Sequence, residues 1–237
     1  QVSRQIIEFG SGLAFTEAVN YCIKSALSGF EWAGGLPGSV GGAIRGNAGA
    51  FGGEIKDNLV SLVSYNIKLR EEIKRGADEC RFGYRTSLFK TESTREEIIL
   101  SARFKFTPED RSLIAERTEK NIQYRIDHQP LDYPSAGSTF KNIPCDQAPP
   151  ELVTTYEKSI KIDPFPTIPV ARLLSDAGLK GKRIGQAQIS EKHPNFIVNL
   201  GEAKSSDILG LIKLAQKTIK QKFAVSIEPE ITYLGYK

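Results

Sequence analysis

A dense run of glycines is the first feature of the chain whose residue types could do chemistry. Residues 34–53 contain nine glycines and one proline. A glycine backbone can approach a ligand closely, and its exposed N–H groups can hold a phosphate or a ring carbonyl. The stretch matches neither the dinucleotide-binding pattern G-x-G-x-x-G nor the P-loop pattern. Glycine density alone leaves a ligand cradle and a set of tight turns equally open, and it predicts neither a regular helix nor a central strand here.

A second feature is an arginine that follows a tyrosine in a short glycine-containing segment. Tyr84 and Arg85 come directly after Gly83. A guanidinium is planar and permanently charged, so at this place it could lie against an anion or an aromatic ring. Taken alone, the segment favours the plainer interpretation, which is an arginine on a surface turn.

A third feature is a pair of serines, Ser135 and Ser138, with Lys141 and Asn142 close behind them. We expect both serines in a turn. The segment lacks the G-x-S-x-G elbow, and neither histidine of the chain has a triad context, so a hydrolase serine is not predicted. A serine can still donate a proton when a neighbouring charge tunes it. A capped turn is the alternative.

A fourth feature is the sequence Glu228-Pro229-Glu230 near the end of the chain. Alternation of period two would place both carboxylates on one face of a last strand, although Pro229 is expected to kink that strand. A carboxylate at a strand end can act as a general acid. In isolation, the pattern favours an exposed charge.

Composition excludes several classes of protein. The three cysteines are widely spaced and only two histidines are present, so we expect no disulfide framework, no metal site and a reducing compartment. The net charge of +4 is spread among both signs, which suits an anionic small molecule as well as a nucleic acid. Basic and aromatic residues do not alternate as a nucleic-acid surface would need. No apolar run approaches the roughly 20 residues of a membrane helix.

Hydrophobic spacing and turn residues predict the elements that must position these side chains. The expected helices cover residues 15–27 with Thr16 as N-cap, 107–127, 169–177 and 206–221, and the expected strands cover 57–68, 97–106, 196–200 and 224–234. The 237 residues allow one large domain or two modest ones. The mixture indicates an α+β chain in two parts, divided around residues 106–115.

In combination and in this order, five segments resemble the UDP-N-acetylenolpyruvoylglucosamine reductase (MurB) family of bacterial peptidoglycan synthesis. The segments read GLPGSVGGAIRGNAGAFG, FGYRTSLF, PSAGSTFKN, LLSDAGLKGKRIGQAQISEKHPNFIVN and EPEITYLG. The resemblance extends over most of the chain, from about Phe9 to Gly235.

The resemblance implies a bacterial, cytoplasmic flavoenzyme, a UDP-N-acetylmuramate dehydrogenase. FAD would take hydride from NADPH and pass it to the enolpyruvyl group of the UDP-sugar substrate. The implied partners are therefore the UDP-sugar and NADPH, with no nucleic acid and no membrane insertion, and a monomer is favoured.

The implied fold is a PCMH-type (vanillyl-alcohol-oxidase-like) FAD-binding domain, with its N-terminal part missing, followed by an α+β substrate-binding domain. Residues 1–108 would form the later part of the FAD-binding domain and residues 109–222 the substrate-binding domain. Residues 223–237 would form a strand that returns to the active site. The stretch of sequence between Arg85 and Pro134 is short, as in the shorter, type II form of the family.

The same resemblance implies roles for individual residues. Arg85 would polarise the substrate, Ser138 would donate the proton, and Glu230 would also act at the substrate. The flavin-facing residues would be Gly35, Leu36, Pro37, Gly38, Ser39, Gly41, Gly42 and Asn47, and the further substrate-binding residues would be Tyr84, Lys141 and Asn142. Hydride addition to an enol ether builds carbanion character beside the substrate carboxylate, which a cation and hydrogen-bond donors would stabilise. The alternatives are another PCMH-type flavoprotein and a non-catalytic nucleotide-sugar-binding module.

Overall fold

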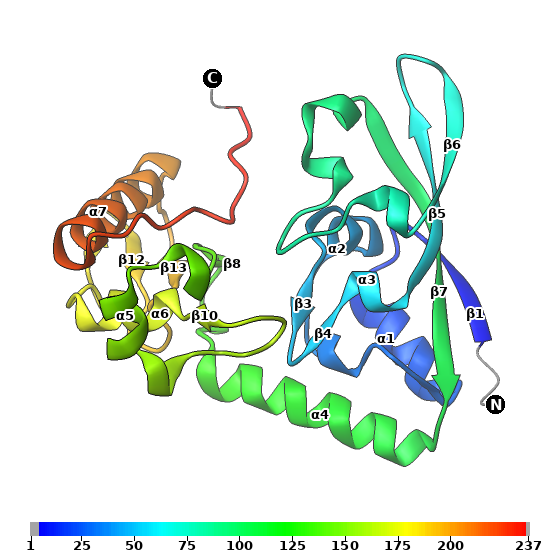
Figure 1. Ribbon diagram of the computed structural model, residues 1–237, viewed down its shortest axis with the longest axis horizontal. Helices are drawn as coiled ribbons and strands as arrows, with labels where there is room; N and C mark the ends of the chain where they lie inside the picture. Colours follow the sequence, from blue (N-terminus) through cyan, green and yellow to red (C-terminus); the bar gives the residue numbers. More distant parts are fainter. Residues whose placement is uncertain (1–4, 236–237) are drawn as a thin grey trace. The chain divides into compact units, whose positions relative to one another are not determined.

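The structure is a computed structural model and describes residues 5–235. Tertiary contacts divide the chain into two compact units, Gln1–Arg125 and Ile126–Lys237 (Figure 1). Each unit has its own hydrophobic core. The two-part α+β organisation thus agrees with the sequence, whereas the roles assigned to residues 1–108, 109–222 and 223–237 stay predictions.

The first unit is built on an antiparallel sheet in which β7 is the central strand (Figure 1). The strand order is β1 (Gln5–Gly10), β7 (Glu97–Pro108), β5 (Leu59–Asn66) and β6 (Glu71–Gly76), and β2 (Leu27–Ser28) pairs with the end of β7. Ala102, Phe104 and Phe106 alternate along β7 and are buried. This period-two pattern is what places one face of the sheet against the core.

Short elements cover the buried face of this sheet. They are α1 (Phe15–Lys24), η1 (Glu31–Ala33), α2 (Val40–Gly46), β3 (Gly49–Ala50), β4 (Gly53–Glu54), α3 (Ile55–Asn58), η2 (Asp78–Cys80), η3 (Leu88–Lys90) and η4 (Glu92–Thr94). An aromatic cluster fills the space between, since the ring of Phe30 lies 5.0 Å from Phe15, 5.1 Å from Phe104 and 4.8 Å from Phe106. These edge-to-face and tilted contacts give the core a specific geometry beyond its apolar area.

The long helix α4 (Arg111–His128) begins at an aspartate cap. The carboxylate of Asp110 accepts hydrogen bonds from the backbone N–H of Ser112 at 2.8 Å and of Leu113 at 3.3 Å. The predicted start at Thr107 was wrong, because Thr107 and Pro108 still belong to β7 and pair with β2. Edge pairing therefore outweighed the local capping signal of the Thr-Pro sequence.

The second unit is built on a four-stranded antiparallel sheet. Its strand order is β11 (Arg183–Ile184), β12 (Ala187–Ile189), β13 (Phe196–Asn199) and β8 (Ser135–Ser138). The remaining elements are β9 (Ile143–Pro144), η5 (Cys145–Gln147), α5 (Pro150–Thr155), η6 (Glu157–Ser159), β10 (Thr167–Ile168), α6 (Val170–Asp176) and α7 (Ser205–Phe223). The core residues Leu173 and Leu174 of α6 and Leu211 and Ala215 of α7 are fully buried.

Two local predictions in the first unit were wrong. Thr16 does not cap α1, because the helix already includes Phe15 and its N-cap is Ala14. The glycine-rich stretch does contain a helix, α2, whose N-cap Ser39 accepts a hydrogen bond from the N–H of Gly42 at 3.2 Å. Val40, Ala43 and Ile44 are buried in α2, so apolar packing stabilises a helix that three glycines disfavour.

Two further predictions failed in the second unit. Ser135 and Ser138 lie in a strand, β8, and not in a turn. Residues 224–234 form no regular strand; among the described residues, the only β-bridge that they form joins Pro229 to Phe140. Pro229 has no N–H to donate, which limits the ladder to the backbone groups on either side of it.

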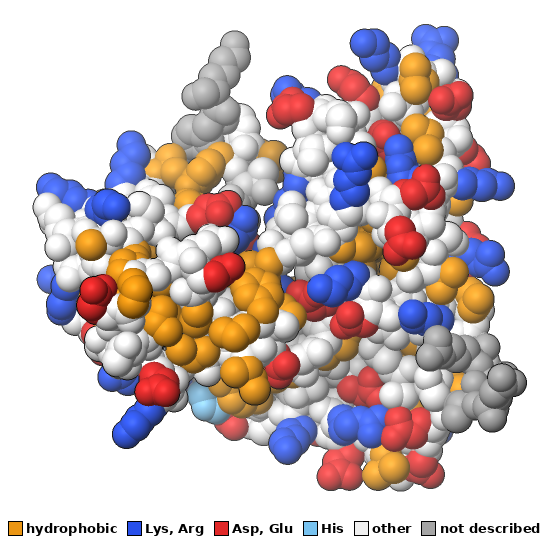
Figure 2. Space-filling model, viewed as in Figure 1, with side chains coloured by type: hydrophobic (Ala, Val, Ile, Leu, Met, Phe, Trp, Pro, Cys, Tyr) orange, Lys and Arg blue, Asp and Glu red, His pale blue; other side chains and the backbone are white. Residues whose placement is uncertain are grey.

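Charges of both signs are interspersed on the face of the molecule shown in Figure 2. Among residues 5–235, no helix is long and apolar enough to cross a membrane.

Candidate active site

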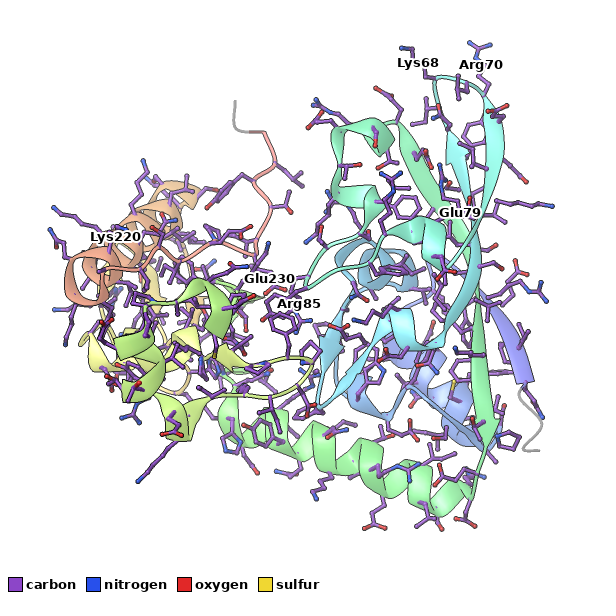
Figure 3. The ribbon with its side chains drawn as sticks, viewed as in Figure 1. Lys68, Arg70, Glu79, Arg85, Lys220 and Glu230 are labelled. Carbon is purple, nitrogen blue, oxygen red and sulfur yellow. The ribbon has the colours of Figure 1, made fainter. Side chains whose placement is uncertain are left out.

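Arg85 lies in a tight turn of the first unit (Figure 3). The turn is closed by a pair of backbone hydrogen bonds between Gly83 and Thr86, and Arg85 adopts a left-handed conformation with φ of 55°. Its Nη2 donates to the carbonyl of Gly49 at 2.6 Å, and its guanidinium carbon stands 5.1 Å from the centre of the Tyr84 ring. The guanidinium is thus held at a defined place instead of extending into solvent.

A buried carboxylate, Glu54, lies beside this guanidinium. Its Oε1 is 3.9 Å from Nη1 of Arg85, and its Oε2 is 2.7 Å from Nζ of Lys56. The amide of Asn47 donates to the same Oε2 at 3.3 Å. Glu54 is only 4% exposed. A buried carboxylate is stable only when cations and donors surround it, as they do here.

Two hydrogen bonds join the glycine-rich segment to the Arg85 turn in addition to the bond from Arg85 to Gly49. Asn47 donates from Nδ2 to the carbonyl of Gly83 at 3.0 Å, and the hydroxyl of Ser87 donates to the carbonyl of Arg45 at 2.8 Å. Asn47 is fully buried and its Oδ1 accepts from the N–H of Lys56 at 3.1 Å. Its amide group is therefore occupied by protein partners, and it shapes the loop from within.

The first residues of the glycine-rich segment carry backbone N–H groups that could bind a ligand. In the part of the chain that the structure describes, the N–H groups of Gly35, Gly38 and Ser39 have no acceptor. Gly35 and Gly38 have φ of 72° and 107°, which side chains rarely tolerate, and both are exposed. These properties fit a segment that binds a ligand through its main chain.

Helix α4 fixes the start of this segment. The buried Arg125 donates from Nε to the carbonyl of Gly34 at 2.8 Å, and its guanidinium carbon lies 5.1 Å from the centre of the Phe51 ring. Burial lowers the pKa of Arg125 from its ordinary value. A Cβ on Gly34 would stand 2.6 Å from the carbonyl oxygen of Thr118, so the helix backbone leaves room only for glycine.

The second unit carries the other predicted catalytic residues. Ser138 is the exposed last residue of β8, and no described residue forms a hydrogen bond with its hydroxyl. The N–H of Glu230 donates to the carbonyl of Thr139 at 2.8 Å. The two backbone segments that carry Ser138 and Glu230 therefore run side by side. Asn195 fixes this region, because its side chain bonds both the N–H and the carbonyl of Phe140.

The two predicted substrate-binding residues of the second unit have protein partners of their own. Lys141 pairs with Glu228, whose Oε1 lies 2.6 Å from Nζ. The Oδ1 of Asn142 accepts a hydrogen bond from the N–H of Val170 at 3.2 Å, at the start of α6. A ligand phosphate would have to compete with these contacts or share them.

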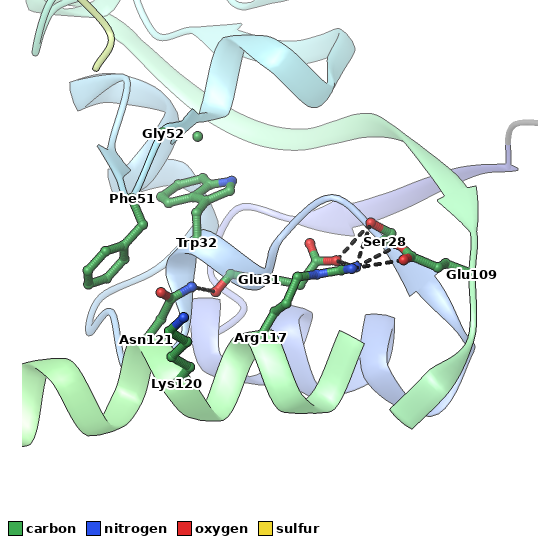
Figure 4. A pocket seen from close by; sticks show the side chains of 10 residues that line it. Ser28, Glu31, Trp32, Phe51, Gly52, Glu109, Arg117, Lys120 and Asn121 are labelled. Atoms are coloured by element: carbon green, nitrogen blue, oxygen red, sulfur yellow. Dashed lines mark hydrogen bonds and ion pairs between the residues drawn. The ribbon is translucent and has the colours of Figure 1, made fainter. Parts of the chain in front are cut away.

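A cavity of about 530 Å³ in the first unit has none of the predicted site residues in its lining (Figure 4). It is lined by Ser28, Glu31, Trp32, Phe51, Gly52, Gly53, Glu109, Arg117, Lys120 and Asn121. Arg117 binds Glu109 through both nitrogens at 2.8 and 2.6 Å and Glu31 at 2.7 Å. Burial opposes ionisation of Glu31, but hydrogen bonds from Arg117, Ser28 and the backbone outweigh it and lower its pKa. The positive and negative side chains that line this cavity neutralise one another. We therefore do not assign it as the site of an anionic ligand.

Sequence reasoning missed Glu54 and Asn195. Glu54 had a signal, since it directly follows the glycine-rich run of residues 34–53, which contains no acidic residue. Asn195 had none, because an asparagine between a proline and a strand is an ordinary turn residue.

The chain is similar to known proteins over these same regions. Residues 129–234 match the family model described as UDP-N-acetylenolpyruvoylglucosamine reductase, C-terminal domain. A reductase of that name from Fervidobacterium nodosum is 40% identical over 230 residues, which cover 97% of this chain and 66% of the relative. One from Caldicellulosiruptor bescii is 38% identical over 239 residues, covering 99% and 67%. The chain thus spans about two thirds of the length of these curated relatives.

A solved structure supports the same relationship. The crystal structure of UDP-N-acetylenolpyruvylglucosamine reductase (MurB) from Thermus caldophilus superimposes with a TM-score of 0.74 at 30% sequence identity. The match covers 94% of this chain and 71% of that one. Fold and sequence agree along almost the entire chain, and the chain therefore belongs to the UDP-N-acetylenolpyruvoylglucosamine reductase family.

Proposed function

We propose that the chain reduces the enolpyruvyl group of UDP-N-acetylglucosamine enolpyruvate to UDP-N-acetylmuramate, using NADPH and FAD. One observation carries the proposal. In the first unit, the bonds of Asn47 and Ser87 join a cation, Arg85, to a glycine-rich segment with open backbone donors. Membership of the family supplies the substrate class, and the geometry supplies the groups that this chemistry needs.

The first unit fits a flavin in its donor set. The N–H groups of Gly35, Gly38 and Ser39 suit the carbonyl oxygens of a flavin ring, and a Cβ at Gly38 would meet nothing within 4 Å, which leaves open space in front of the segment. When bound, FAD would supply the hydride. We propose on this basis that the unit is part of a PCMH-type FAD-binding domain, in which Leu36, Pro37, Gly41 and Gly42 complete the flavin-facing segment.

Each catalytic group has one task in this proposal. The Arg85 guanidinium stabilises the negative charge that develops beside the substrate carboxylate as hydride adds to the double bond. The hydroxyl of Ser138 gives its proton to the resulting carbanion, so that one hydride and one proton complete the reduction. Glu230, if it is protonated, donates a further hydrogen bond to the substrate. Tyr84, Lys141 and Asn142 bind the remainder of the UDP-sugar.

Between Arg85 and Pro134, the chain forms only η3, η4, β7 and α4. No further loop is inserted among these elements. We assign the chain to the shorter, type II form of the family on this ground.

The two half-reactions test the role of Ser138. Ser138→Ala should leave NADPH-driven flavin reduction nearly unchanged and slow substrate-driven reoxidation by about 10²- to 10⁴-fold, the usual contribution of a positioned general acid. Ser135→Ala is the matched control, since Ser135 is an exposed serine of the same strand, and it should slow neither half-reaction. Stopped-flow absorbance of the flavin measures both steps. Equal loss of both half-reactions in Ser138→Ala would overturn the assignment.

A further inference from the structure

We propose that Glu54 is a positioning residue for the reaction, which acts by holding the guanidinium of Arg85 in place. The expected effect on catalysis rests on the proposed function, whereas the placement of Glu54 beside Arg85 does not depend on that function. Glu54 belongs to β4, a strand of two residues, and its carboxylate is almost fully buried. A buried charge at such a place requires a reason, because removing a carboxylate from water is costly.

The backbone of the β3–β4 hairpin aims the carboxylate. Gly49 pairs with Glu54 across the hairpin, and the connecting Phe51 and Gly52 both have positive φ, 50° and 82°. Two such residues form the tight turn that matches the twist of paired strands. The N–H of Glu54 also donates to Asp57 at 2.8 Å, which fixes the residue on its other side.

The two oxygens of Glu54 have different neighbours. Oε2 is satisfied by Lys56 at 2.7 Å and Asn47 at 3.3 Å. Oε1 is buried, and no hydrogen bond from the described part of the chain reaches it. The cation nearest to it is Nη1 of Arg85, at 3.9 Å. One oxygen therefore anchors the carboxylate, and the other directs its charge at Arg85.

The other terminal nitrogen of the guanidinium is held by Gly49. Nη2 of Arg85 donates to the carbonyl of Gly49 at 2.6 Å. A Cβ on Gly49 would lie 2.7 Å from Cγ of Glu54 and 3.1 Å from Nη1 of Arg85. The absence of a side chain at Gly49 is thus what allows the acid and the guanidinium to approach each other.

Two attractions, one at each terminal nitrogen, restrict the rotation of a planar cation. A misplacement of about 1 Å can reduce an enzymatic rate by about 10²-fold. Glu54→Gln keeps the shape of the side chain and removes its charge. It should therefore slow substrate-driven flavin reoxidation in the intact, flavin-loaded protein by about 10- to 100-fold. NADPH-driven flavin reduction should stay within about twofold of the wild-type rate.

A double-mutant cycle separates positioning from a general loss of stability. If Glu54 acts through Arg85, Glu54→Gln should not slow reoxidation further in the Arg85→Ala background. The matched control is Glu97→Gln, because Glu97 is also a buried carboxylate of the first unit and pairs with Arg75 at 2.6 Å. It should lower the unfolding temperature without slowing reoxidation. An equal slowing by Glu54→Gln with and without Arg85 would overturn the proposal.

A second readout needs no flavin and no substrate. The side-chain ¹⁵N–¹H signals of Arg85, assigned by their loss in Arg85→Ala, should show slow hydrogen exchange in the wild type and faster exchange in Glu54→Gln. Unchanged exchange would overturn the proposal even if the enzyme is active. An inactive wild type that shows the predicted exchange would overturn the proposed function and leave the role of Glu54 intact. Should Glu54→Gln fail to fold, Gly49→Ala is the second variant and should release the guanidinium in the same measurement.

Discussion

His193 is a half-buried imidazole in the turn between β12 and β13. Its ring lies 4.9 Å from that of Phe196, edge to face, and no described residue forms a hydrogen bond with its Nδ1. Burial, together with the positive charges of Lys161, His128 and Lys180, lowers the pKa of His193 to about 4. The folded chain therefore holds this residue neutral at pH values where an exposed histidine would be protonated.

This shift predicts how stability depends on pH. Between pH 6.5 and about 4 the unfolded chain binds a proton at His193 that the folded chain does not, so the free energy of unfolding should fall as the pH falls through this range. Above pH 6.5 the contribution is complete. Urea denaturation at a series of pH values should show this slope, and His193→Asn should flatten it. An identical slope in the variant would contradict the assignment.

At the scale of single residues, the sequence could predict which residues belong to the candidate site better than it could predict their contacts. Arg85 and Ser138 were found from their motifs, and their catalytic roles remain proposals. Sequence did not reveal that the amide of Asn47 is turned inward to Gly83 and Glu54, because those bonds depend on a left-handed backbone at Asn47 itself. It also did not reveal that Asn142 holds the start of α6.

Among the elements, long periodic segments were predicted well. The strands β5 and β7 and the helices α6 and α7 lie within a few residues of their expected bounds. The failures have different physical causes. Helix α2 forms because its apolar residues are buried, which outweighs local preference. The chain after α7 forms a bridge with Phe140 instead of a regular strand, because Pro229 has no N–H to donate.

The contact between α4 and the glycine-rich segment is testable at this scale. Gly34→Ala should reduce the free energy of unfolding by about 1–3 kcal/mol, because its Cβ would press on the backbone carbonyl of Thr118 at 2.6 Å. Gly46→Ala is the matched control. Its Cβ would meet nothing within 4 Å, and alanine in a helix should add about 0.5–1 kcal/mol. Chemical denaturation of both variants measures the two changes in the free energy of unfolding. Changes of the same sign in both variants would contradict the contact.

On the scale of the whole molecule, the two-part α+β organisation could be predicted from the mixture of expected helices and strands along the sequence. The boundary itself could not be predicted to the residue. Contacts divide the chain after Arg125, inside α4, because the side chain of Arg125 is buried against Gly34 of the first unit. A single continuous helix thus belongs to both units, which composition alone does not reveal.

The proposed cofactor predicts the spectrum of the molecule. The intact protein should be yellow, with flavin absorbance that NADPH bleaches and that UDP-N-acetylglucosamine enolpyruvate restores. The absence of any flavin band in the purified protein, or reoxidation by oxygen alone, would contradict the proposal. Anaerobic titration followed by visible absorbance makes the measurement.

The left-handed backbone around the site has a consequence for how much this sequence can be stabilised. Asn47, Phe51 and Arg85 all have φ between 43° and 55°. Such a conformation costs a residue with a side chain roughly 1–2 kcal/mol. These three are among the seven non-glycine residues with positive φ in the described part of the chain, so local preference and overall fold disagree at the site itself. Glycine at Phe51 would relieve part of that strain, and it would also loosen the turn that aims Glu54. Stability and catalytic geometry therefore oppose each other in this hairpin.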